Sequence, residues 1–127
     1  MSYFRMILLT FFFASLFSCQ NQTSLEYITV YEFYEQREQM DVVILDVRTP
    51  VEVEQGNIPG AIHMDYYDDN FQQELEKLDK TKAYLVYCKS GGRSNDAAVR
   101  MVELGFSKIY DLEGGITAWL EAGYELE

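Results

Sequence analysis

Cys88 has the local sequence of a cysteine that reacts as a thiolate. It directly follows the apolar, β-rich run 84–87. The five residues after it are small or cationic: Lys89, Ser90, Gly91, Gly92 and Arg93. A free cysteine, with a pKa of about 8.5, is mostly protonated at neutral pH, but a helix N-terminus stabilises an anion, and a helical pattern spans 95–104. We therefore expect Cys88 to work as a thiolate; the alternative is a small buried hydrophobic residue at a strand end.

The spacing within this loop limits the chemistry. Gly91 and Gly92 have no Cβ, so they can turn their N–H groups inward around a bound anion. Lys89 and Arg93 add positive charge beside them. Four residues lie between Cys88 and Arg93, which makes a six-residue loop. Cysteine phosphatases use a similar loop with one residue more, wide enough for a phosphate, whereas the shorter ring suits a single sulfur atom carried on the cysteine.

Residues 88–94 resemble the active-site loop of the rhodanese-like sulfurtransferase domain, which often reads C-[KR]-S-G-x-R-S. The chain reads CKSGGRS there and fits every position. A second family pattern, D-V-R, a short acidic helix and G-H-I-P-G-A-I, is matched over 46–62 except at Asn57, where the family usually has histidine. The family's closing pattern, E-G-G-x-x-x-W, is matched at 113–119. Three motifs in the correct order extend the resemblance over residues 27–127.

The resemblance implies a fold and an activity. The fold is α/β, a three-layer α/β/α domain around a mainly parallel sheet of about five strands. The activity is the transfer of sulfane sulfur from thiosulfate, or a similar small anionic donor, to a thiol or cyanide through a persulfide on Cys88. Donor binding is expected from the loop residues Lys89, Ser90, Gly91, Gly92 and Arg93. No metal or organic cofactor is implied.

Two other functions stay open. Relatives of this fold can be cysteine phosphatases or arsenate reductases, although the short loop argues against that reading. The domain could also be a non-catalytic module that binds or relays a persulfide received from a partner. Turnover of a phosphotyrosine analogue would favour the first alternative. Sulfur loading from a persulfide donor, but not from thiosulfate, would favour the second.

Asp46, Arg48 and Glu52, which follow the apolar run 42–45, allow two interpretations. They could form a charged catalytic set, but buried carboxylate–arginine pairs are usually architectural. We therefore expect them to pair with one another and with loop amides. Ser94 is expected to give the loop similar structural support. The lone histidine, His63, has no second histidine or cysteine nearby to complete a metal site, so we assign it to the structure as well.

The rest of the pattern alternates strands and helices, as an α/β sheet requires. We predict strands at 27–30, 42–45, 83–87 and 108–112. We predict helices at 30–40, 50–55, 71–78 and 95–104. Thr49 and Pro50 are suited to the N-cap and first position of the second helix. Trp119, near a terminal helix, is expected to anchor the core.

The N-terminal residues have the pattern of an export signal. Residues 6–17 form a continuous apolar run, shorter than the ~20 residues of a transmembrane helix, so residues 1–18 are typical of a signal peptide. The sequence LFSC at 16–19 resembles a bacterial lipobox, which implies a lipid on Cys19. An ordinary signal peptide cut near Ser18 and a retained N-terminal anchor are the alternatives.

The resulting organisation is a signal peptide, a polar tether over 19–26 and a rhodanese-like domain over 27–127. With Cys19 lipidated, Cys88 is the one thiol left, so sulfur loaded on it must leave to an outside acceptor. The expected location is the cell envelope, as a membrane-anchored lipoprotein facing the periplasm. The chain of 127 residues suits one domain, and its formal net charge of −11 argues against nucleic-acid binding.

Overall fold

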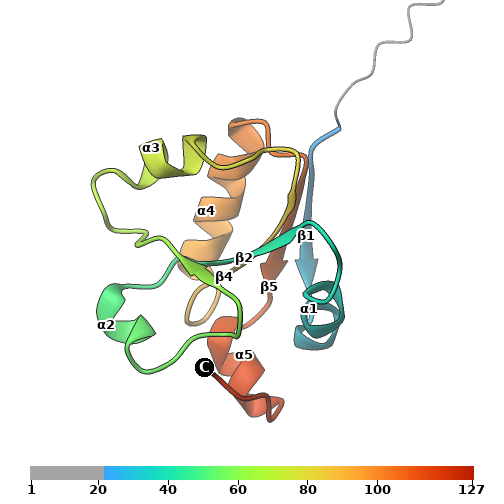
Figure 1. Ribbon diagram of the computed structural model, residues 1–127, viewed down its shortest axis with the longest axis vertical. Helices are drawn as coiled ribbons and strands as arrows, with labels where there is room; N and C mark the ends of the chain where they lie inside the picture. Colours follow the sequence, from blue (N-terminus) through green and yellow to red (C-terminus); the bar gives the residue numbers. More distant parts are fainter. Residues whose placement is uncertain (1–21) are drawn as a thin grey trace, which may run out of the picture.

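A five-stranded sheet crosses the centre of the computed structural model, which describes residues 22–127 (Figure 1). Its strand order is β1-β5-β4-β2-β3, and all neighbouring strands are parallel. The strands are β1 (Ser24–Ile28), β2 (Val42–Asp46), β3 (Ile62–His63), β4 (Ala83–Tyr87) and β5 (Lys108–Leu112). The carboxyl ends of parallel strands meet at one edge of the sheet, where functional loops are commonly built.

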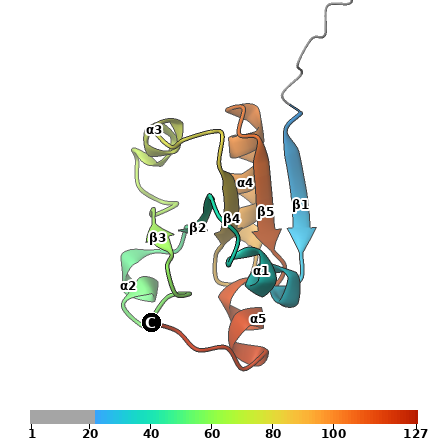
Figure 2. The same ribbon diagram turned by 45° about the vertical axis from the view of Figure 1, so that its right-hand side comes forward.

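Helices cover both faces of the sheet (Figures 1 and 2). They are α1 (Val30–Gln36), α2 (Pro50–Val53), α3 (Phe71–Glu76), α4 (Gly92–Glu103) and α5 (Gly115–Glu121). Side chains of α3 and α4 pack into one buried cluster, which includes Phe71, Leu75, Val86, Cys88, Ala98 and Met101. Side chains of α1 and α5 pack into the other, which includes Phe33, Leu85, Tyr87, Ile116 and Trp119. The expected α/β/α fold is confirmed, and so is the packing role of Trp119.

β4 fixes the position of the cysteine. It lies between β5 and β2, and its residues 84–87 are buried. Val86 packs toward α4 and Tyr87 packs toward α1, so an uninterrupted apolar run is what a strand covered on both faces requires. Because Cys88 follows this strand directly, the thiol starts from a rigid part of the molecule.

The ends of several elements differ from the prediction. β1 begins at Ser24, inside the segment expected to be a tether, because all five of its residues pair with β5. An edge strand with exposed side chains needs no apolar run. The polar residues at the start of β1 were therefore not recognised as part of a strand. The two-residue strand β3 was too short to show a pattern. α1 ends at Gln36 and not at residue 40, and the chain then turns through Asp41, whose φ is 60°.

None of the helices in residues 22–127 is long and apolar enough to cross a bilayer. The expected signal peptide and the expected lipidation of Cys19 fall within residues 1–21, outside the described residues.

Candidate active site

The Cys88 thiol lies where the centre of the sheet meets the N-terminus of α4. Its residue is only 1% exposed and packs in the cluster on the α4 side of the sheet. Gly91 is the N-cap of α4 and has a φ of 119°, a backbone conformation that favours glycine. Its N–H donates a hydrogen bond to Cys88 Sγ at 3.1 Å. The loop glycine thus turns an amide toward the sulfur.

Hydrogen bonds around this sulfur favour the thiolate. Burial by itself raises the pKa of Cys88, but hydrogen bonds from Ser94, Gly91 and Ser90 outweigh burial and hold the pKa below its ordinary value. Ser94 contributes both its hydroxyl and its backbone N–H. α4 begins at Gly92, earlier than the pattern over 95–104 indicated, and this brings Ser94 into the first turn. The Ser94 hydroxyl donates to the Gly91 carbonyl at 3.2 Å, which ties the first turn of α4 to the loop.

Arg93 is held by α2. Its guanidinium donates to both carboxylate oxygens of Glu52, at 2.7 and 2.8 Å. The Arg93 guanidinium holds the pKa of Glu52 well below its usual range. The expectation that Glu52 pairs with Asp46 and Arg48 was wrong, because Arg93 reaches it from α4.

The N-terminus of α2 orients Glu52. Thr49 and Glu52 form a capping box, in which each side chain accepts a hydrogen bond from the other's backbone N–H. The Thr49 hydroxyl also donates to Glu52 Oε2 at 2.9 Å. The predicted N-cap at Thr49 and Pro50 in the first turn are confirmed.

Asp46 and Arg48 form a separate, buried pair, as expected. Arg48 Nη2 lies 2.7 Å from Asp46 Oδ2, and both side chains are at most 5% exposed. The Tyr87 hydroxyl donates to the same carboxylate at 2.7 Å and accepts from the Ile58 N–H at 3.1 Å. Arg48 also donates to the Gly56 carbonyl at 2.8 Å. This network joins the ends of β2 and β4 to the loop before β3.

The first turn of α5 contacts the cysteine loop through its main chain. The N–H groups of Ile116 and Thr117 donate to the carbonyl oxygens of Cys88 and Lys89, at 2.9 and 3.2 Å. A Cβ on Gly115, whose φ is 58°, would lie 2.5 Å from both of those oxygens. Only glycine allows the two backbones to approach so closely. The double glycine was recognised only as part of a family pattern, and this contact was missed.

A groove of about 270 Å³ runs beside the loop. Lys89 and Thr117 line it together with the apolar side chains of Leu120 and Leu126. Lys89 is exposed and forms no ion pair within residues 22–127. Of the two loop cations, Lys89 therefore stays available to an anion from solvent, whereas Arg93 is committed to Glu52.

Asn57, at the position where the family usually has histidine, contacts the C-terminal residue. Its backbone exchanges two hydrogen bonds of 3.0 Å with Glu127. Its side chain donates to Glu127 Oε1 at 3.2 Å and to the Ile58 carbonyl at 3.0 Å. The C-terminus accordingly lies close to α2 in both views (Figures 1 and 2). Asn57 has a structural role here.

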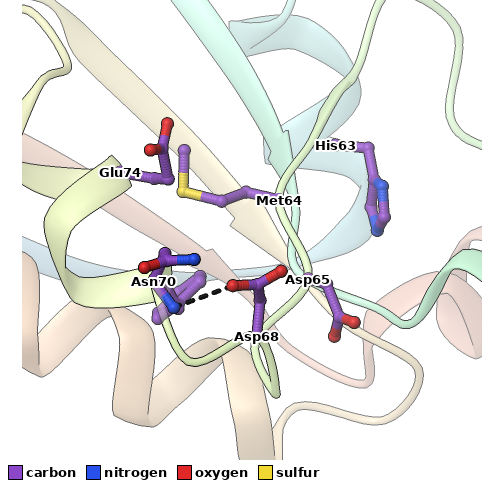
Figure 3. A pocket seen from close by; sticks show the side chains of 7 residues that line it. His63, Met64, Asp65, Asp68, Asn70 and Glu74 are labelled. Atoms are coloured by element: carbon purple, nitrogen blue, oxygen red, sulfur yellow. Dashed lines mark hydrogen bonds between the residues drawn. The ribbon is translucent and has the colours of Figure 1, made fainter.

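A second hollow, of about 300 Å³, lies between β3 and α3, and none of residues 88–94 lines it (Figure 3). Its lining includes three carboxylates, Asp65, Asp68 and Glu74. The Asn70 N–H donates to Asp68 at 2.7 Å. His63 points away from Glu74 (Figure 3), and its Nε2 lies 2.6 Å from the Arg48 carbonyl oxygen. In the part of the chain that the structure describes, no group of three or more His, Cys, Asp or Glu side chains is placed to hold a metal ion.

Comparisons with known proteins agree with this arrangement. A family model described as the rhodanese-like domain matches residues 29–122. Thiosulfate sulfurtransferase GlpE from Coxiella burnetii is 39% identical over 88 residues, which are 69% of this chain and 80% of that protein. The crystal structure of a rhodanese-related protein from Thermoplasma volcanium is similar, with a TM-score of 0.72 and 32% identity, over 80% of this chain and 97% of that one.

A third relative carries a different description. A protein of unknown function from Rhodopseudomonas palustris, described as a possible tyrosine phosphatase, has a TM-score of 0.64 and 28% identity, over 81% of this chain and 85% of that one. The family match covers most of the chain and includes both the cysteine loop and the first turn of α5, which contacts it. The chain therefore belongs to the rhodanese-like domain family.

Proposed function

We propose that this protein is a sulfurtransferase that moves sulfane sulfur from thiosulfate, or a similar small anionic donor, to a thiol or cyanide. The observation that carries the proposal is the Cys88 sulfur at the N-terminus of α4, with the Gly91 N–H directed at it. A thiolate with a lowered pKa is the nucleophile that this chemistry needs. The relative from Coxiella burnetii, named a thiosulfate sulfurtransferase, supports the same activity.

The proposed reaction has two half-reactions. In the first, the Cys88 thiolate attacks the outer sulfur of thiosulfate; a new S–S bond forms, the old one breaks, and its electron pair leaves with sulfite. In the second, an acceptor thiolate or cyanide attacks the outer sulfur of the persulfide, and the electron pair of the broken S–S bond returns to Cys88. Cys88 is the one free cysteine of the described residues, so the acceptor comes from outside.

The loop residues have separate roles in this scheme. Backbone N–H groups of residues 89–93 stabilise the outer sulfur of the persulfide, as an oxyanion hole stabilises oxygen. Lys89, exposed at the groove, attracts the anionic donor. Arg93 stays bonded to Glu52 throughout the reaction, and from there its positive charge favours the Cys88 thiolate.

The test is the intact mass of the purified protein before and after incubation with thiosulfate, followed by cyanide. We expect a gain of one sulfur atom, lost when cyanide is added, and no gain in a Cys88→Ser variant. Equal loading of Cys88→Ser would contradict the proposal. No gain from thiosulfate but a gain from a persulfide donor would replace it with a persulfide relay.

Phosphatase activity is the second candidate, because of the description given to the relative from Rhodopseudomonas palustris. Two observations weigh against it. The loop has only four residues between Cys88 and Arg93, and both terminal nitrogens of the Arg93 guanidinium already donate to Glu52. Measurable turnover of a phosphotyrosine analogue that disappears in Cys88→Ser would establish this activity.

We also propose that the protein is an exported lipoprotein attached to a membrane through Cys19. The support is the apolar run 6–17 and the LFSC sequence that ends at Cys19. Radiolabelled palmitate should be incorporated by the wild-type chain in a bacterial host and not by a Cys19→Ala variant. Equal labelling of both chains, or of neither, would contradict the proposal.

A further inference from the structure

The strands of the sheet begin at one edge, opposite the Cys88 loop. Ser24, the first residue of β1, pairs with Lys108 of β5, and Lys108 pairs with Ala83 of β4. In Figures 1 and 2 the start of β1 lies toward the end of the molecule that holds α3, and α5 lies at the other end. We call this side of the sheet the amino edge; it consists of the starts of β1, β2, β4 and β5 and the turns 37–41, 77–82 and 104–107.

The amino edge is joined to the proposed lipid anchor by a short stretch of chain. Four residues, 20–23, lie between Cys19 and Ser24 in the sequence. Fully extended, the chain from Cys19 to Ser24 spans at most about 17 Å. The sheet has about the same height, since its longest strands have five residues at about 3.3 Å each. A membrane that holds Cys19 therefore lies near the amino edge, but this connection alone is long enough to let the domain lie on its side.

Lysines are concentrated at the amino edge. Lys80 and Lys82 lie in the turn before β4, and Lys108 is the first residue of β5. None of the three forms an ion pair within residues 22–127. The Lys80 carbonyl accepts hydrogen bonds of 3.0 Å from both the N–H and the hydroxyl of Ser107, which holds the turns before β4 and β5 together. Lys108 is opposite Ser24, so these cations lie where the chain enters the sheet.

The two edges of the sheet differ in charge. At the amino edge, Lys77 pairs with Glu74 at 2.6 Å. The other lysines there are roughly balanced by four exposed carboxylates, Asp41, Glu76, Asp79 and Glu103.

The opposite edge, with the C-terminal segment beside α2, is acidic. Its turns and the chain end carry Asp65, Asp68, Asp69, Glu113, Glu125 and Glu127. An anionic lipid surface attracts lysines and repels carboxylates within about a Debye length. The charge distribution therefore favours the amino edge as the side that meets such a surface.

Met40, in the turn before β2, adds an apolar group to the amino edge. It is 90% exposed, more than any other large apolar side chain in residues 22–127. The neighbouring Asp41 carbonyl accepts from the Ala83 N–H at 3.3 Å, so this turn lies beside the start of β4. An apolar side chain beside lysines is suited to the interface between lipid headgroups and acyl chains.

We propose that the amino edge lies against an anionic phospholipid surface and that the Cys88 loop faces the aqueous phase. Lys80, Lys82 and Lys108 contact the headgroups, and Met40 enters the interface. The inference rests on the proposed lipidation of Cys19 and deepens the proposed sulfur transfer. It assigns the acceptor to the water-soluble thiols, because a thiol carried by a lipid would have to reach Cys88 across the height of the sheet, about 17 Å.

The test uses Lys89, an exposed lysine of the Cys88 loop, as the internal control. The full-length chain, purified from a bacterial host, is placed in vesicles of phosphatidylcholine and phosphatidylglycerol and exposed briefly to a water-soluble acetylating reagent. We expect acetylation of Lys80, Lys82 and Lys108 to be at least about threefold slower than in detergent, and that of Lys89 to be unchanged. Equal protection of all four lysines, or of none, would overturn the proposal. Equal protection on phosphatidylcholine alone would overturn the role of lipid charge.

Methionine oxidation by peroxide tests the same orientation without reading out a lysine. Met40 should be oxidised more slowly on vesicles than in detergent, whereas Met64, beside β3 at the opposite edge, should react equally in both. A variant in which Lys80, Lys82 and Lys108 are all changed to glutamine should lose about half or more of the protection of Met40. Lys77→Gln, whose lysine already pairs with Glu74, is the control and should keep it. Full protection in the triple variant would overturn the role of the lysines.

Flotation with the vesicles separates this proposal from the ones on which it rests. Wild-type chain should float and Cys19→Ala should not. If the wild-type chain did not float, the proposed lipidation would be wrong and this orientation with it. A chain that floats but leaves Lys80, Lys82 and Lys108 unprotected would overturn the orientation alone. None of these measurements needs a sulfur donor, so their outcome is independent of sulfur transfer.

Discussion

The cysteine loop is held on two sides by two different kinds of contact. On the α5 side the contact is between main chains. The N–H groups of Ile116 and Thr117 donate to the carbonyl oxygens of Cys88 and Lys89, and Gly115, just before them, lies close to the same two oxygens. On the α2 side the contact is between side chains, Arg93 and Glu52, which are 18% and 26% exposed. We refer to these as the main-chain contact and the side-chain contact.

The two contacts differ in how much change they tolerate. In the main-chain contact, a single added carbon at Gly115 would lie 2.5 Å from two carbonyl oxygens, so the backbone itself must move. In the side-chain contact, two long and partly exposed side chains can adjust, and their attraction depends on charge and pH. The main-chain contact therefore sets the position of the loop, whereas the ion pair orients Arg93 within a loop that is already in place.

Gly115→Ala should break the main-chain contact and have the largest effect. An alanine costs about 1–2 kcal/mol in the left-handed region, and overpacking adds about 1–3 kcal/mol, so the free energy of unfolding should fall by roughly 2–5 kcal/mol. Because the clash moves the carbonyls of Cys88 and Lys89, persulfide formation should fall at least tenfold. Urea denaturation and intact mass after brief exposure to thiosulfate measure the two effects.

Gly123→Ala is the matched control. Gly123 also has a positive φ, 85°, but a Cβ there would meet nothing within 4 Å. In this variant the free energy of unfolding should fall only by the cost of alanine in the left-handed region, about 1–2 kcal/mol. Persulfide formation should stay normal. If Gly115→Ala behaved like Gly123→Ala in both measurements, the main-chain contact would not position the loop.

Glu52→Gln should weaken the side-chain contact and have an intermediate effect. Glutamine can keep the capping box with Thr49 but has no charge for Arg93. We expect the free energy of unfolding to fall by about 1–2 kcal/mol, with persulfide formation retained within about tenfold because the main-chain contact is intact. Chemical denaturation and initial rates of sulfur loading measure this.

α1 supplies the control for this change. Glu32 forms a capping box with Thr29 that has the same pattern as that of Glu52 with Thr49, but no arginine of residues 22–127 is bonded to it. Glu32→Gln should therefore lower the free energy of unfolding clearly less than Glu52→Gln does. Equal losses from Glu32→Gln and Glu52→Gln would mean that the Arg93 pair contributes nothing measurable.

The sequence predicted the parts of this site that depend on local order. The run 84–87 predicted the strand that presents Cys88, and Thr49 followed by Pro50 predicted the start of a helix. The two contacts around the loop join segments far apart in the chain. Arg93 and Glu52 are 41 residues apart, and no periodicity links them.

Two further features of the structure were not predicted, for the same physical reason. Gly115 was seen as half of a double glycine, but only packing shows that its missing Cβ makes room for the Cys88 carbonyl. Asp111 was taken as one residue of the last strand. Its burial, with no ion pair to any lysine or arginine of residues 22–127, depends on the α4 layer above it. Local patterns thus predicted the elements, whereas the contacts between them required the tertiary structure.

The side-chain contact should depend on pH in a defined direction. The Arg93 pair depresses the pKa of Glu52, and a depressed carboxyl contributes stability that is present above its unfolded pKa and is lost as pH falls toward the folded value. The difference in unfolding free energy between wild type and Glu52→Gln should be constant from about pH 7 to pH 5 and shrink below about pH 4. Denaturation curves at several pH values measure it, and a difference that grows on acidification would contradict the assignment.

Among the changes around the loop, the smallest effect should come from Thr49→Ala, which removes the cap of α2 and leaves both Glu52 and Arg93 in place. Loss of a threonine N-cap costs about 1 kcal/mol. We expect Thr49→Ala and Thr29→Ala, measured by chemical denaturation, to lose equal amounts to within about 0.5 kcal/mol, because the two capping boxes have the same hydrogen bonds. The two-pronged bond from Arg93 should then be enough to keep Glu52 oriented. If Thr49→Ala lost more unfolding free energy than Thr29→Ala by over about 1 kcal/mol, the side-chain contact would depend on the helix cap. It would then have less freedom to adjust than its difference from the main-chain contact implies.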